Sequence, residues 1–150
     1  MRPVLAVVTG ALIAVASQAH GQVKGPLTPA GCLALEPSGQ VEARGRLSVR
    51  TFPGPPNFES VAAGDRAERT YLLTLPTPIC VDDGKAGFAD PAARFDTVHV
   101  SVRDERLWPR LRAALGKTVA VTGEGFAAFD GHHHAPLVVL ADKVEVVDGP

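Results

Sequence analysis

The segment DGHHHAPLVV, residues 130–139, places three consecutive histidines between a turn-forming Asp-Gly pair and an apolar run. Residues two apart in an extended chain point the same way, so His132 and His134 could bind one metal ion, zinc or another divalent cation. The spacing fixes no third ligand, and the candidates are Asp130, His99 and Glu124. The tract has no H-E-x-x-H motif and no Cys/His framework. A polar hairpin tip held by hydrogen bonds is therefore favoured over a metal site or a pH switch.

Five segments of the chain have the composition of β-strands, and they must position the histidines. Residues 41–52 alternate strictly between small or apolar and polar side chains, which predicts a strand with one buried face. Similar patterns predict further strands over residues 69–81, 95–103, 118–129 and 136–147. Pro76 and Pro78 indicate an edge or a bend at the end of the second strand. Gly123 and Gly125 indicate a bulge or a sharp bend in the fourth.

A single helix is predicted between the third and fourth strands. Apolar residues recur at helical spacing over residues 104–117, with Asp104 as a candidate N-cap and Gly116 as the stop. Pro109 belongs near the first turn or kinks the helix. Three strands, one helix and two strands is the order of the OB-fold, so we expect a mainly β, five-stranded OB-fold-like barrel. A small open β-sandwich is the alternative.

Two unusual loops fall where an OB-fold frames its binding cleft. The first, Phe52–Ser60, joins strands one and two, and the second, Asp130–Ala135, joins strands four and five. The prolines of the first loop either stiffen a platform that offers side chains to a partner or form a rigid crossover with Phe58 turned inwards. The candidate ligand-binding residues are Phe52, Pro53, Pro55, Asn57, Phe58, Glu59 and His133.

The N-terminal segment has the layout of a secretory signal peptide. Arg2 precedes an apolar run over residues 4–16, which is too short to span a bilayer. We expect residues 1–19 to be removed, or residues 1–21 if cleavage follows Gly21. Residues 20–38 are predicted to be an irregular lead-in, and residues 39–148 to form the barrel domain. A periplasmic or secreted protein without a transmembrane anchor is expected.

The net charge of the chain argues against one class of partner, nucleic acid. Removing Arg2 leaves fourteen basic residues against 16 acidic ones, so binding to nucleic acid is not expected.

The two cysteines, Cys32 and Cys80, are an even pair. In an oxidising compartment they predict a disulfide, with two reduced and buried thiols as the alternative. The chain has no G-x-S-x-G, Walker or dinucleotide motif. No catalytic residues and no cofactor are therefore assigned.

Four segments resemble a family of small bacterial exported proteins catalogued as domain of unknown function 4431. They are TFPGPPNFES, PICV, LGKTVAVTGEGF and GHHHAPLVV. The resemblance covers residues 32–147, and it implies that both unusual loops are family features. Family members are similar in carrying one cysteine before the first strand and one after the second, where Cys32 and Cys80 stand. The resemblance implies no activity.

These observations favour a non-enzymatic, exported binding module whose site lies between the two loops. Its partner would be an unknown small molecule or an envelope protein. A metal carrier or a small metal-dependent hydrolase that uses His132 and His134 is the alternative. A purely structural envelope protein is the third hypothesis.

Overall fold

The computed structural model describes residues 22–147, which form a mainly β structure with one short α-helix. This confirms the predicted mainly β class. The elements in chain order are β1 Val23–Lys24, β2 Leu33–Ala34, β3 Ser38–Pro53, the 3-10 helix η1 Val61–Ala63, β4 Ala67–Ile79, β5 Val81–Asp82, β6 Phe95–Val102, the 3-10 helix η2 Glu105–Leu107, α1 Trp108–Ala113, β7 Thr118–Ala127 and β8 Leu137–Val146.

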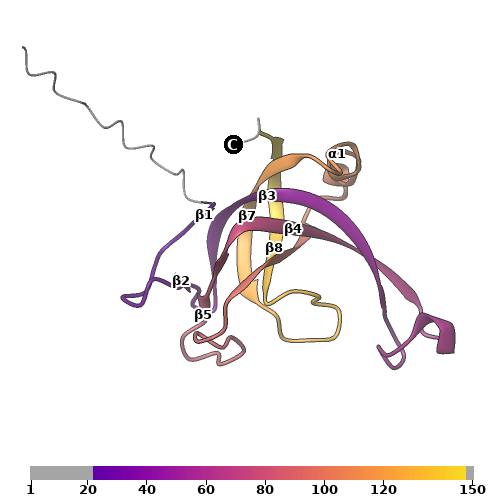
Figure 1. The fold of residues 1–150 in the computed structure, drawn as a ribbon, viewed down its shortest axis with the longest axis horizontal. Coiled ribbons are helices and arrows are strands. Elements are labelled where there is room, and N and C mark those ends of the chain that lie inside the picture. The colour runs from indigo at the N-terminus through magenta and orange to yellow at the C-terminus, as the bar shows by residue number, and fades with distance from the viewer. Residues whose placement is uncertain (1–21, 148–150) are drawn as a thin grey trace, which may run out of the picture.

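The five long strands close into a ring (Figure 1). Their order is β3-β4-β6-β8-β7, and β7 pairs back with β3. The length of β3 makes this closure possible, because its first half pairs with β7 and its second half with β4. All pairs in the ring are antiparallel except β6 with β8.

Two features near the chain start differ from the predicted irregular lead-in. The short strand β1 pairs with β3, and β2 pairs in parallel with β5. The predicted disulfide between Cys32 and Cys80 is present, and it joins the residue before β2 to the residue before β5. Backbone groups that lie beside a sheet need hydrogen-bond partners, and this segment finds them by forming short strands. Its composition, rich in Gly and Pro, does not indicate such pairing. The predicted signal peptide, residues 1–19 or 1–21, lies outside the described residues.

The predicted helix over residues 104–117 is shorter than expected. Asp104 caps the 3-10 turn η2 by accepting the N–H of Arg106 at 2.9 Å, and α1 ends at Ala113. Pro109 lies in the first turn of α1, where its missing N–H costs nothing. Gly116, with φ 77°, then ends the segment in a left-handed conformation. Among the described helices, none has the length and apolar character needed to cross a membrane.

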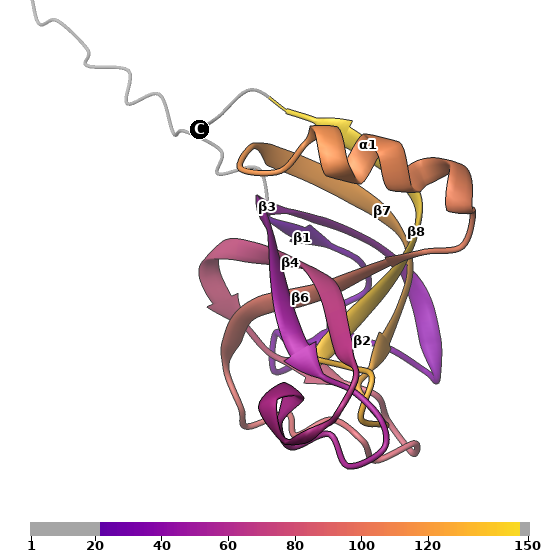
Figure 2. The same cartoon turned by 90° about the vertical axis from the view of Figure 1, so that its right-hand side faces the viewer.

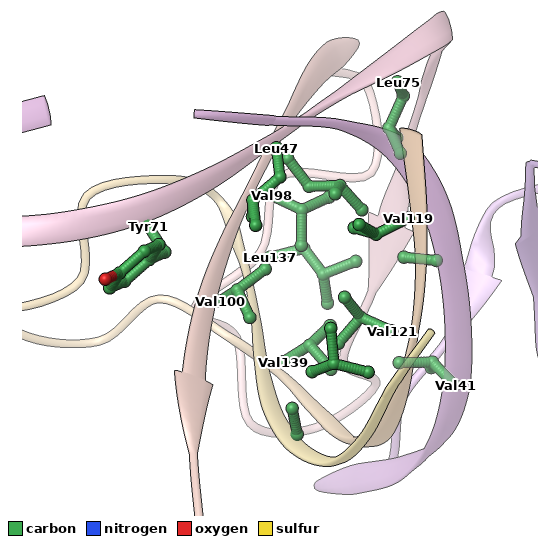
Figure 3. Packing of buried hydrophobic residues seen from close by; sticks show 14 of the residues in the cluster. Val41, Leu47, Tyr71, Leu75, Val98, Val100, Val119, Val121, Leu137 and Val139 are labelled. Atoms are coloured by element: carbon green, nitrogen blue, oxygen red, sulfur yellow. The ribbon is translucent and has the colours of Figure 1, made fainter. Parts of the chain in front are cut away.

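The core fills the inside of the ring (Figure 3). Alternate residues of each strand point inwards, so Val41 and Leu47 of β3 share one buried cluster with Leu75 of β4 and Val121 of β7. Leu111 of α1 is fully buried in the same cluster. Two views show α1 at one end of the ring and the β3–β4 and β7–β8 loops towards the other (Figures 1 and 2). The helix therefore closes the end of the ring that is remote from both unusual loops.

Candidate functional site

The loop between β3 and β4 is organised by a buried aspartate that the sequence did not single out. Asp65 is 5% exposed, and its carboxylate accepts the backbone N–H groups of Asn57, Glu59 and Ser60 at 2.9, 2.8 and 2.8 Å. These N–H groups stabilise the charged form, so they lower the pKa of Asp65. The loop is thus a compact structure built around one carboxylate.

Replacing Asp65 with asparagine is expected to destabilise this loop, because an amide can accept fewer N–H groups and adds two donors of its own. We expect the melting temperature at pH 7 to fall by roughly 5 °C. Since the pKa of Asp65 is lowered in the folded state, its stabilising effect is present above the unfolded pKa of about 3.9 and disappears as pH falls through the folded pKa. The two melting temperatures should therefore converge in strong acid.

The control for this change is Asp96→Asn, since Asp96 is exposed and its carboxylate accepts, among the described residues, only the hydroxyl of Thr97. Differential scanning calorimetry from pH 7 to pH 3 measures the effect. An equal loss for Asp65→Asn and Asp96→Asn at pH 7 would contradict the assigned role of Asp65.

The histidine turn, Asp130–Ala135, sends its three imidazole rings to different neighbours. Asp130 shapes the turn, because its carboxylate accepts the N–H of His132 at 2.9 Å and its carbonyl accepts that of His133 at 3.2 Å. The ring of His132 is half exposed, whereas the side chains of His133 and His134 are 13% and 9% exposed. His133 lies against Phe126 and Phe129, with ring centroids 5.3 and 4.5 Å away.

One carboxylate joins the histidine turn to the ribbon of β3 and β4. Nδ1 of His132 lies 2.8 Å from one oxygen of Glu68, and Nε2 of His134 lies 3.4 Å from the other. Glu68 is the register partner of Phe52, whose ring stacks on His134 at 4.1 Å and 4°. A side chain from each strand of the ribbon therefore contacts the turn.

The proline-rich loop also reaches the turn through Phe58. Its ring meets that of His132 edge to face, with centroids 5.1 Å apart. Phe58 has φ 59°, a left-handed conformation that bulky residues rarely adopt. The two loops are thus neighbours in the folded chain, and the partly buried ring of Phe58 contacts the histidine turn.

His99 on β6 lies beneath the histidine turn. Its Nδ1 accepts the backbone N–H of His134 at 3.4 Å, and the two rings stack with centroids 5.9 Å apart. Burial, followed by the neighbouring His134 and His133, lowers the pKa of His99 to about 4. Burial likewise lowers the pKa of His133. Both rings are therefore neutral at pH 7.

The predicted ligand-binding residues divide into two groups. Phe52, Phe58 and His133 belong to the cluster of rings. The other four shape the loop or lie at its surface: Pro53 ends β3, the carbonyl of Pro55 accepts the N–H of Arg66, the side chain of Asn57 donates to Asp65, and Glu59 is exposed. Glu68 was missed, and its only sequence signal is its place just before a predicted strand.

The two predicted metal ligands both face Glu68. Within residues 22–147, however, no group of three or more His, Cys, Asp or Glu side chains is arranged to hold a metal ion. His132 and His134 are instead within hydrogen-bond or ion-pair distance of the Glu68 carboxylate. Of the other candidate ligands, Glu124 is paired with Ser38 and Arg103.

Comparison with known proteins identifies one family. The model of the family described as "Domain of unknown function (DUF4431)" matches residues 97–145, from the third residue of β6 to the penultimate residue of β8. This segment includes His99 and the whole histidine turn, whereas Glu68 and the proline-rich loop precede it. No curated protein and no solved structure matches the chain. The match over residues 97–145 supports membership of the DUF4431 family.

Proposed function

We propose that this protein is an exported, OB-like binding module that takes a small ligand between the Phe52–Ser60 loop and the histidine turn. The strand order β3-β4-β6-β8-β7, the parallel pairing of β6 with β8 and the helix between β6 and β7 support an OB-like barrel. In such a barrel, the loops between strands one and two and between strands four and five flank the ligand. These are the two loops that meet here.

The observation that carries this proposal is the contact of both loops around Glu68. Its carboxylate faces two imidazoles that lie 64 and 66 residues further along the chain. Phe52 and Phe58 complete the assembly, each against one of these two rings. Binding sites combine aromatic surface with a few fixed polar groups, and this arrangement supplies both without a long flexible segment to order.

The exposed side of the assembly favours a particular kind of ligand. His132 and Glu59 are reachable from solvent beside the half-buried ring of Phe58. Together they offer an aromatic edge, an imidazole and a carboxylate, a combination that suits a neutral or cationic ring compound carrying hydrogen-bond donors. Nucleic acid is not proposed as a partner, because the formal charge of the chain is −1.

Export is a separate part of the proposal. The apolar segment near the chain start supports a signal peptide, and the Cys32–Cys80 disulfide is typical of proteins that fold in an oxidising compartment. Both features support a periplasmic or secreted location, and the proposed partner is a small molecule or an envelope protein.

The test is a fragment titration followed by amide chemical shifts in ¹H–¹⁵N spectra. The probes are soluble ring compounds at millimolar concentration, divided into neutral, cationic and anionic sets. We expect neutral or cationic fragments to shift amides of residues 52–60 and 130–135, with an affinity at least about tenfold weaker for Phe58→Ala and His132→Ala.

The matched control is Arg112→Ala, an exposed position on α1 at the opposite end of the ring, which should leave the affinity unchanged. Fragments that bind only elsewhere, or that bind both loop variants as well as the unaltered protein, would contradict the proposed site. A parallel titration with ZnCl₂ addresses the metal alternative. An affinity tighter than about 10 μM that disappears in His132→Ala would favour the metal alternative.

A further inference from the structure

The outer face of the sheet carries an apolar row beneath the histidine turn. Leu72, His99 and Val138 are register neighbours across β4, β6 and β8. The next residues, Leu73 and Val139, belong to the core, so the row points to the opposite face. Even so, Leu72 and Val138 are only 3% and 2% exposed. Some part of the chain must therefore cover them.

The histidine turn lies over this row. The ring of His134 stacks on His99, the central residue of the row. The ring of His133 contacts Phe126, which is the register partner of Val138 on β7. Phe52 packs on His134 in turn. The cover is thus made of aromatic and imidazole rings rather than of another strand.

Two hydrogen bonds that hold this cover end on imidazole nitrogens. The backbone N–H of His134 donates to Nδ1 of His99 at 3.4 Å, and the backbone N–H of Phe129 donates to Nδ1 of His133 at 3.2 Å. An imidazole nitrogen accepts a hydrogen bond only while it carries no proton. Protonation would turn Nδ1 of His99 into a donor that faces an N–H group. Nδ1 of His133 would lose its hydrogen bond from Phe129 in the same way, but it also lies 3.3 Å from the carboxylate of Asp130, which can accept a hydrogen bond from it.

We propose that the histidine turn is a proton-released cover, which is closed at neutral pH and opens in acid to expose the apolar row of Leu72 and Val138. This inference goes beyond the proposed function, because the cover can open whether or not a ligand binds.

The charges around His99 agree with the direction of this change. His99 faces His133, His134 and Asp130 of the turn and Glu68 of β4. Burial and the two histidines lower its pKa, whereas Glu68 and Asp130 oppose that effect. In the open state, His99 would take up a proton near its ordinary pKa of about 6.5, so acid favours opening between about pH 6.5 and pH 4. Glu68 also lies against His132 and His134 of the turn.

Amide hydrogen exchange, followed by NMR, tests the proposal in the unaltered protein. Between pH 7 and pH 4.5, the protection factors of the His134 and Phe129 amides should fall at least about tenfold. The amides of core residues such as Val98 and Val121 should stay protected. Unchanged protection of His134 and Phe129, or loss of protection at the same pH as the core, would overturn the proposal.

A double variant separates proton release from general acid sensitivity. In His99→Asn with His133→Asn, the side-chain oxygen can accept the same N–H group but does not titrate, so both amides should remain protected at pH 4.5. The matched control is His132→Asn, since Nδ1 of His132 faces Glu68, and it should keep the acid transition. Opening of the double variant at the same pH as the unaltered protein would overturn the proposal.

Discussion

Replacing both Cys32 and Cys80 with alanine is expected to lower the free energy of unfolding by about 4 kcal/mol. The disulfide joins residues 48 positions apart, so its loss frees a long loop in the unfolded chain. The bond also ties the β2–β5 pair to the ring, next to the end of β4. Urea denaturation followed by circular dichroism measures the change.

The single variant Cys32→Ala is the matched control, because it removes the cross-link and keeps one cysteine. It should lose nearly as much stability as the double variant. A loss below about 1 kcal/mol in both would show that the cross-link constrains little. Thiol labelling of the unreduced, denatured protein is the independent check. Two reactive thiols would contradict both the disulfide and the proposal of export.

The second large effect is expected for Gly123→Ala, which should cost about 3 kcal/mol. The register of β7 with β8 shifts next to Gly123, where the sequence predicted a bulge or a sharp bend. A Cβ atom there would overlap the carbonyl of Leu140 and lie 2.8 Å from Cα of Ala141. Both are backbone atoms, so the clash can be relieved only by moving a strand.

The control is Gly39→Ala, also at a glycine within a long strand. A Cβ atom there would meet its nearest neighbour, the side chain of Leu35, at an ordinary 3.8 Å. Gly39→Ala should therefore change the stability by less than about 1 kcal/mol. The two variants are compared by urea denaturation. Equal stabilities would mean that β7 and β8 do not approach so closely at Gly123.

The strands were predictable because their signals are local. Burial alternates along residues 41–47 as the side-chain pattern indicated, and β7 and β8 each lie within two residues of the predicted bounds. The prolines at 76 and 78 correctly indicated an irregularity, since the pairing of β4 with β6 shifts register between Thr74 and Ile79. The helix was overestimated, because helical spacing of apolar residues does not distinguish an α-helix from the 3-10 turn that precedes Pro109.

The site was predictable only in part. The composition of the histidine turn and of the proline-rich loop marked both as unusual. Predicting that the two loops lie near each other also required the order of the strands in the sheet. Asp65 and Glu68 gave no comparable signal. Asp65 acts through N–H groups five to eight residues earlier in a loop whose shape was unknown, and Glu68 acts through rings more than 60 residues away. Such contacts depend on the register of the strand pairs, which cannot be read from a single sequence.

By itself, the amino-acid sequence determined that the chain forms strands, where the two unusual loops lie and that two cysteines are available to pair. Alternation, turn residues and side-chain chemistry act over a few residues, so they can be read along the chain. Only the tertiary structure decided that Glu68 faces the histidines, that His99 lies beneath them and that both ring nitrogens accept backbone N–H groups. Ring closure and the register of its five strand pairs set those distances, because each pairing places residues that are remote in sequence opposite one another.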